Sequence, residues 1–289
     1  MDLYIQMAVG ASTNAAIYAL IALSLVLVYR GSGVVNFGVG YIAAFGGIFF
    51  SNFGAGGWPA LVTSLAVGGL LGMAAYLLSV RIGERSGAST TFLAMATLGF
   101  GLVLEYFAGK FWAKEGFSPK PLWRGSEHVG GVTISHERIL TVIAAAVCFL
   151  IVLAILEKSM IGWAMEAVAY RRSTAASYGV NTVGVTLVVW LLAGVIATLA
   201  GSLLAPVTSI SREVALPLAI QGFAAAVVGG LGSVSGAVLG AIVVSVVQAL
   251  VVQYISTSYA SAFAFILLFV VLALKPQGIM GGRRQVRHT

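Results

Sequence analysis

Residues 139–156 read ILTVIAAAVCFLIVLAIL, an uncharged apolar run about long enough to cross a lipid bilayer as a helix. The whole chain has the same character: its 289 residues are 60% hydrophobic and only 9% charged, with 36 glycines and a mean hydropathy of +1.02. A soluble domain carries about 25% charged residues. So few charged residues leave too little polar surface to cover a globule, and the sequence therefore predicts an all-α polytopic membrane protein.

Seven further stretches are candidate membrane segments. Five of them resemble Ile139–Leu156 in length and apolar character: Ile5–Tyr29, Leu61–Val80, Thr90–Gly109, Val183–Pro206 and Ser258–Leu274. The other two, Val34–Phe53 and Leu218–Gln253, are apolar but interrupted by glycines, which let helices approach closely or break.

Lysines and arginines predict the orientation, because cytoplasmic loops carry an excess of them. We place the C-terminal arginines inside, together with Lys158, Arg171 and Arg172; the crossings then agree only if Leu218–Gln253 is a hairpin broken at Gly232–Gly236. The C-terminal arginines are Arg283, Arg284 and Arg287. We expect eight or nine passes, including glycine-broken or re-entrant segments, with the N-terminus outside and the C-terminus inside.

This topology places Arg81 and Arg85 inside and makes residues 110–138, approximately, an extracytoplasmic loop. The basic residues of that loop are offset by Glu115, Glu127 and Glu137. Its Trp112 and Trp123 either anchor the chain at the membrane interface or form a docking surface. We expect a loop or small cap here rather than a domain.

The groups needed for catalysis are missing from the predicted spans. All three histidines fall in loops or the tail, the only Asp is Asp2, and no phosphate-binding G-x-x-x-x-G-K motif occurs. The chain is therefore expected not to be an enzyme, and its net charge of +7 is assigned to loops rather than to nucleic-acid binding. Without acidic or histidine relays for proton coupling, transport would draw its energy from another subunit.

Glu105 is the acidic residue inside a predicted span. Intramembrane carboxylates are costly and commonly functional. Alternatively, Glu105 lies about one turn from the outer helix end, where it can reach the interface or pair with Lys110. Both interpretations stay open.

Three stretches resemble one family, the permease subunits of the branched-chain amino acid class of ABC importers, and the H-type more than the M-type. They are YALIALSLVLVYRGSGVVNFGVGYIAAFGG at 18–47, IGWAMEAVAYRRSTAASYGVNT at 161–182 and GFAAAVVGGLGSVSGAVLGAIV at 222–243. The resemblance covers nearly the whole chain, through LKPQGIMG at 274–281. It makes residues 1–289 a single transmembrane permease domain.

The resemblance implies an importer in a bacterial cytoplasmic membrane. Its partners would be a second, M-type permease, two cytoplasmic ATPases, a solute-binding protein and membrane lipid. No cofactor is expected on this chain, since ATP and Mg²⁺ would bind the ATPases. The expected solute is a branched-chain or other hydrophobic amino acid; urea or a short amide is the alternative within transport, and a passive channel is the alternative class.

Both glycine-rich motifs are candidate parts of the substrate pathway. Asn36 and Phe37 offer an amide and an aromatic ring beside flexible backbone, or they belong to tight helix packing in which Asn36 bonds a neighbouring carbonyl. After the break in the second motif, Gly236 and Gly240 favour close contact with another helix, either at a permease–permease interface or as a structural device. The predicted pathway residues are Asn36, Phe37, Gly38, Gly40, Glu105, Gln221, Phe223, Gly229, Gly230, Gly232 and Ser233.

The polar stretch Ile161–Thr182 lies within a cytoplasmic loop of about residues 158–182 and predicts a short amphipathic helix over Glu166–Tyr178, ended by Gly179. In the resembling family this helix sits in a groove of the ATPase, where Arg171 and Arg172 would meet acidic groups. The alternative is a loop whose arginines bind anionic lipid headgroups. The predicted coupling residues are Gly162, Glu166, Ala169, Tyr170, Arg171, Arg172, Ala175, Ala176 and Gly179.

Overall fold

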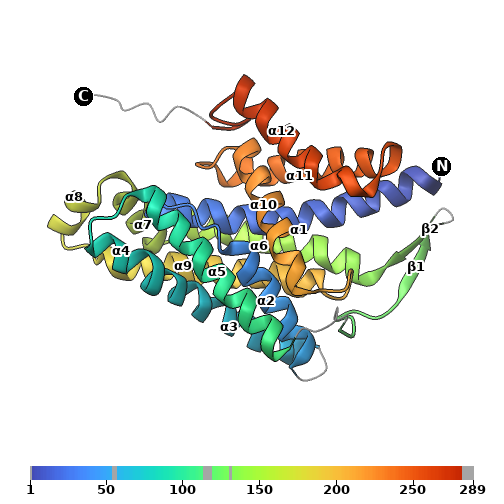
Figure 1. Cartoon of the computed structure of the whole chain (residues 1–289), viewed down its shortest axis with the longest axis horizontal. Helices are drawn as coiled ribbons and strands as arrows, with labels where there is room; N and C mark the ends of the chain where they lie inside the picture. The colour runs from blue at the N-terminus through green and yellow to red at the C-terminus, as the bar shows by residue number, and fades with distance from the viewer. Residues whose placement is uncertain (1, 54–56, 113–118, 130–131, 282–289) are drawn as a thin grey trace.

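The computed structural model describes residues 2–53, 57–112, 119–129 and 132–281 (Figure 1). Glu115 and the C-terminal arginines used to predict the orientation lie outside these residues. The helices are α1 (Asp2–Ser32), α2 (Val39–Asn52), α3 (Trp58–Ala75), α4 (Arg81–Arg85), α5 (Thr90–Phe111), α6 (His136–Lys158), α7 (Met160–Tyr170), α8 (Arg172–Ser177), α9 (Thr182–Leu204), α10 (Ala215–Gly229), α11 (Val234–Tyr254) and α12 (Ala260–Leu274).

Shorter elements complete the described chain. A π-helical turn over Tyr76–Val80 joins α3 to α4, and single 3₁₀ turns occur at Arg212–Val214 and Thr257–Tyr259. The strands β1 (Ser126–Val129) and β2 (Val132–Ser135) form an antiparallel hairpin.

The helices confirm the predicted all-α polytopic membrane fold. Within the described residues, six helices are long and apolar enough to cross a membrane: Tyr4–Ser32, Trp58–Arg85, Thr90–Phe111, His136–Lys158, Thr182–Leu204 and Val234–Tyr254. Three shorter apolar helices accompany them, at Val39–Asn52, Ala215–Gly229 and Ala262–Leu274. The number of passes and the orientation of the termini stay predictions.

Helix α1 lies at the centre of the assembly and packs against α6, α9, α10 and α11. Its residues from Ile17 to Val28 are almost all buried. Polar bonds tie it to its neighbours: Ser24 Oγ donates to the Ala193 carbonyl of α9 at 2.8 Å, and Ser245 Oγ of α11 donates to the Ala11 carbonyl. Such interhelical bonds stabilise packing where lipid offers little hydrophobic driving force.

Close helix contacts depend on glycine. Gly72 of α3 faces Gly194 of α9, where a Cβ added to Gly194 would lie 2.9 Å from the Gly72 Cα. Gly47 of α2 faces Gly201 of α9 in the same way. Without side chains between them, the backbones come close enough for extensive van der Waals contact.

The predicted hairpin within Leu218–Gln253 is present, with its break at Gly230–Ser233 rather than at Gly232–Gly236. Ser233 Oγ accepts a hydrogen bond from the Gly236 N–H at 3.0 Å, so α11 begins at Val234. The proposed permease–permease role of Gly236 and Gly240 is wrong for these two residues: both are buried against the backbone of α10 in this chain.

The segment after α12 docks on this break. The Ile279 and Met280 N–H groups donate to the Val228 and Gly229 carbonyls at 2.8 and 3.0 Å. Gly230 and Gly278 meet there with φ angles of +109° and +79°, which residues with a Cβ rarely adopt. The end of α10 is thereby satisfied by chain rather than by solvent.

The two loops predicted on opposite sides of the membrane lie at opposite ends of the helices. Figure 1 shows α4 and α8 at one end, and the N-terminus with the β1–β2 hairpin at the other. The hairpin was not predicted. The residues on either side of it are joined by Glu137, which accepts the Trp123 N–H at 3.0 Å, and by a tilted contact of the Trp123 and His136 rings, whose centroids are 4.8 Å apart.

We predict that Gly194→Ala lowers the free energy of unfolding by about 1–3 kcal/mol, because the added methyl group meets the backbone of α3. The matched control is Gly99→Ala in α5, where a Cβ meets nothing within 4 Å. That change is expected to be neutral or to stabilise by up to about 1 kcal/mol. Thermal melting of both variants in detergent is the measurement, and equal melting temperatures would contradict the packing described here.

Candidate functional site

A cavity of about 810 Å³ opens at the end of the helices that carries α4 and α8; we call it the basic cavity because Arg30 and Arg172 line it. Its wall combines the last turn of α1, α7, the α10–α11 break and the segment that follows α12. Predicted pathway and predicted coupling residues both line it. They are Phe223, Gly232 and Ser233 from the first group and Ala169 and Arg172 from the second.

An aromatic pair adjoins the basic cavity. Phe223 of α10 contacts Phe37, with ring centroids 5.4 Å apart. The Phe37 N–H donates to Thr97 Oγ1 of α5 at 3.0 Å, and this bond fixes the non-helical turn before α2. The structure therefore brings together two predicted pathway residues that are 186 positions apart (223 minus 37).

The other residues of the first motif take packing positions. Asn36 is buried, and its Oδ1 accepts the Gly38 N–H at 3.0 Å, so its amide shapes the turn rather than bonding a neighbouring carbonyl as the packing alternative expected. Gly38 and Gly40 are buried where α2 approaches Thr97 and Ala215. None of these three residues is among those lining the basic cavity.

The remaining predicted pathway residues are dispersed. Gly229 lies in the α10–α11 contact, Gly230 against the segment after α12, and Gln221 in a different cavity. Glu105 is half-buried on α5. Among the described contacts no ion pair joins it to Lys110, whose Nζ lies 5.9 Å from the Tyr106 ring centroid.

The predicted helix over Glu166–Tyr178 is wrong in one respect: it consists of two helices, α7 and α8, separated at Arg171. Arg171 is extended, with φ −157° and ψ 99°. Helix α7 begins earlier than predicted, because Ser159 Oγ caps it by accepting the Gly162 N–H at 3.1 Å. The break changes the direction of the chain, buries Ala175 and brings Arg172 to the bundle.

Gly179 ends α8 as predicted. Its φ is +81°, its N–H donates to the Ala176 carbonyl at 3.0 Å, and the Val180 N–H donates to the Ala175 carbonyl at 3.1 Å. This is the Schellman arrangement that commonly closes a helix.

Helices α7 and α8 expose large apolar side chains outside the membrane spans. Four are at least 66% exposed, namely Met160, Trp163, Tyr170 and Tyr178. Glu166, Arg171 and Ala176 are exposed too, Ala169 is half-buried, and Gly162 is buried close to the Leu156 carbonyl. We call this face the α7–α8 surface. Exposed aromatic side chains beside charges are typical of interfaces.

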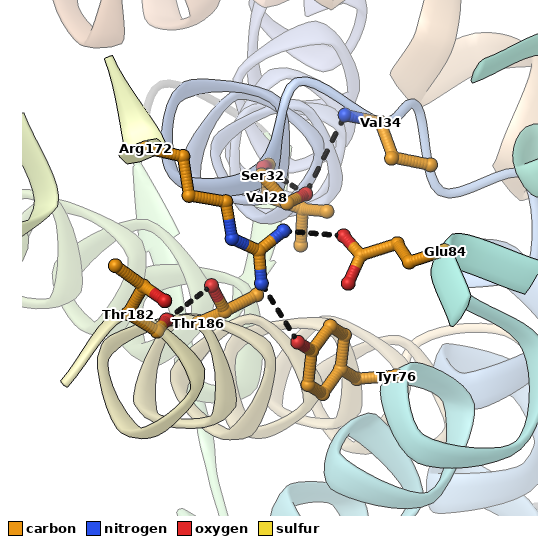
Figure 2. Close-up of polar contacts among 8 residues, drawn as sticks. All are labelled: Val28, Ser32, Val34, Tyr76, Glu84, Arg172, Thr182 and Thr186. Atoms are coloured by element: carbon orange, nitrogen blue, oxygen red, sulfur yellow. Dashed lines mark hydrogen bonds and ion pairs between the residues drawn. The ribbon is translucent and has the colours of Figure 1, made fainter. Parts of the chain in front are cut away.

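Arg172 connects α8 to the spans. Figure 2 shows its guanidinium between Glu84 and Tyr76; it donates to Glu84 Oε1 at 2.5 Å and to the Tyr76 hydroxyl at 3.3 Å. Burial alone would lower the pKa of Arg172, but hydrogen bonds and charge from Glu84 and Tyr76 outweigh it and raise the pKa. Arg172 is therefore already engaged within this chain, whereas Arg171 is exposed.

Sequence analysis missed Glu84 and Tyr76, which lie 88 and 96 residues from Arg172. Tyr76 is fully buried at the start of the π-helical turn, and its ring lies 6.0 Å from that of Trp190 in α9. Turns of this kind recur at functional positions in helices. The Arg172–Glu84–Tyr76 network therefore joins α8 to the α3–α4 span and to α9.

A family model described as the branched-chain amino acid transport system / permease component matches residues 7–272. The chain belongs to this family. The permease is 26% identical over 294 residues to the high-affinity branched-chain amino acid transport system permease protein BraD of Pseudomonas aeruginosa, with 96% of each chain covered. It is 28% identical over 295 residues to the corresponding protein LivH of Escherichia coli, again with 96% of each chain covered.

Two further matches are weaker, the first in the share of the chain covered and the second in sequence identity. A probable branched-chain amino acid transport permease protein LivH of Methanocaldococcus jannaschii is 28% identical over 245 residues, or 79% of this permease and 75% of that protein. In a solved structure, PsaBC from Streptococcus pneumoniae in complex with Fab, one chain matches with a TM-score of 0.53 and 10% identity. That likeness covers 93% of this permease and 91% of that chain and concerns the fold alone.

We predict that Arg172→Glu and Glu84→Arg each destabilise the permease, because each reversal places two like charges together. The double exchange should recover part of the loss, with a coupling energy of about 0.5–3 kcal/mol. Arg171→Glu, one residue away and exposed, is the control and should leave the melting temperature unchanged. Strictly additive losses in the double variant would show that the pair makes no contribution.

Proposed function

We propose that this permease is the membrane subunit of an ATP-driven importer that moves branched-chain or other hydrophobic amino acids into the cytoplasm. The observation that carries the proposal is the α7–α8 surface, exposed at the helix end where the basic cavity opens and tied to the spans through Arg172. The names of its relatives support the solute class.

In this proposal a cytoplasmic ATPase contacts the α7–α8 surface. The chain has no G-x-x-x-x-G-K motif of its own, so ATP and Mg²⁺ would bind the ATPase. Tyr170 and Tyr178 offer apolar contact area, and exposed Arg171 offers a positive charge for an acidic rim. Movement of α8 would reach the α3–α4 span through Arg172 and Glu84.

The proposal also sets the topology and partners. Residues 1–289 form a single permease domain in a bacterial cytoplasmic membrane, with a cytoplasmic coupling loop at about 158–182 and an extracytoplasmic loop at about 110–138. The full importer has two permeases, of which the second is a related M-type chain, two ATPases and a solute-binding protein that delivers the solute outside.

The Phe37–Phe223 contact adjoins the basic cavity and is proposed to narrow the pathway above it. An aromatic constriction with a water-accessible cavity below it is consistent with a pore open toward the cytoplasm. A passive channel would need no ATPase contact, so solute uptake without the ATPase subunits distinguishes a channel from an importer.

We predict that replacing both Tyr170 and Tyr178 by alanine lowers ATP-driven leucine uptake by proteoliposomes at least about tenfold, because two interface aromatics are lost. Phe269→Ala, which removes a comparably exposed ring of α12, is the control and should transport normally. Leucine uptake that persists without the ATPase subunits would exclude the importer and favour a channel.

The solute class is tested on the partner that delivers it. We expect leucine, isoleucine or valine to raise the melting temperature of the cognate binding protein, since ligand binding to the native state stabilises it by mass action. Urea and acetamide should leave that temperature unchanged. The reverse pattern would replace the amino-acid importer by a urea or short-amide importer of the same architecture.

A further inference from the structure

A second cavity, of about 350 Å³, lies among α1, α10, α11 and α12 in the half of the bundle nearer the N-terminus. We call it the amide cavity, because Asn14, Gln221, Gln248 and Gln253 line it together with Tyr18. None of the described residues around it is Asp, Glu, Lys or Arg. Its volume lies within the roughly 300–1,000 Å³ typical of small-molecule sites.

A hydrogen bond between Tyr18 and Gln248 fixes part of the wall of the amide cavity. Tyr18 and Gln248 are 7% and 4% exposed, and the Tyr18 hydroxyl donates to Gln248 Oε1 at 2.8 Å. The Gln248 amide nitrogen carries two donors, and it makes a long contact of 3.5 Å with the Ala260 carbonyl. The amide is thus held in place and retains hydrogen-bonding capacity at the cavity.

Contact between this cavity and lipid hydrocarbon would be energetically unfavourable. Asn14 is exposed, and it lies ten residues into the span Tyr4–Ser32, or about 15 Å along the helix. Gln221 is half-buried on α10. Amides facing hydrocarbon without partners are unfavourable, and polar residues at such depth mark solute pathways.

Both cavities contact α10, on different faces of the helix. Gln221 lines the amide cavity, and Phe223, two positions further on, lines the basic cavity. Between them Gly222 is buried against Ile21 of α1. Residues two apart on a helix point to different faces, so the amide cavity and the basic cavity lie on different faces of α10 at neighbouring depths.

We propose that the amide cavity binds the transported solute, and that it selects a zwitterionic amino acid with an apolar side chain. This rests on the proposed function. Amide N–H groups can donate to the solute carboxylate and amide oxygens can accept from its ammonium group, without a net charge in the wall. Met7, Ala249 and Val252 supply apolar surface for the side chain.

Cysteine accessibility tests the cavity independently of transport. Cys148 is the single cysteine, so Cys148→Ala gives a cysteine-free permease. In that background Asn14→Cys and Gln221→Cys should react with a membrane-impermeant thiosulfonate on the assembled importer. Thr133→Cys in the exposed hairpin is the positive control, and Val147→Cys on the apolar face of α6 is the negative one.

The labelling rates of Asn14→Cys and Gln221→Cys are then compared with and without leucine, in the presence of the binding protein. Leucine should slow the labelling at both positions. Two outcomes overturn the proposal: no reaction at either position while Thr133→Cys reacts, which means that protein or lipid fills the cavity, or reaction that leucine leaves unchanged.

Transport supplies the second arm. Gln221→Leu and Gln248→Leu should each lower the maximal rate of leucine uptake about tenfold in equal amounts of assembled complex, because hydrogen bonds to a charged head group are lost. Thr63→Val, which removes an exposed hydroxyl of α3 outside the cavity, is the matched control and should transport normally. Normal leucine uptake by Gln221→Leu would also contradict the proposal that the amide cavity binds the solute. If the unsubstituted importer fails to take up leucine, the proposed function fails instead, and the labelling still reports on the cavity.

Discussion

The direct contact of helix backbones at glycine is the constraint on which the architecture depends. Inside a bilayer, helices gain little from burying apolar side chains, so stability comes from close van der Waals contact and interhelical hydrogen bonds. Gly72 with Gly194 joins α3 to α9, and Gly229 with Gly236 closes the α10–α11 hairpin. The second contact places the Gly230–Ser233 break beside the basic cavity, and α9, α10 and α11 all pack around the central α1.

Within this packed frame, one ion pair connects the membrane part to the segment outside it. Arg172 is held by Glu84 and Tyr76, and Tyr76 in turn contacts Trp190. Moving one partner of a partly buried ion pair away costs free energy, because the charge of the other partner is left without compensation. The network is therefore suited to pass a displacement of α8 to the α3–α4 span, which begins near the opposite end of the bundle.

Much of the fold follows from local sequence, whereas the network does not. The apolar runs locate the spans. Three glycines in the five residues 229–233 (Gly229, Gly230 and Gly232), with Gly236 three residues later, mark the hairpin break only to within a few positions. No glycine or proline marks the break at Arg171. The break coincides with the tertiary contact of the next residue, Arg172, with Glu84, 88 residues away, and such a contact cannot be read from local sequence. The β1–β2 hairpin was not predicted because its two strands are only four residues long and resemble a loop in sequence.

If an ATPase acts on the permease at the α7–α8 surface, Tyr178, which is 85% exposed, lies within reach of that subunit. Replacing Tyr178 with a photo-crosslinking benzoyl-phenylalanine, in the importer assembled in membranes, measures this contact. We expect a crosslink between this position and the ATPase subunit. Crosslinks confined to lipid, with the ATPase present in the complex, would contradict it.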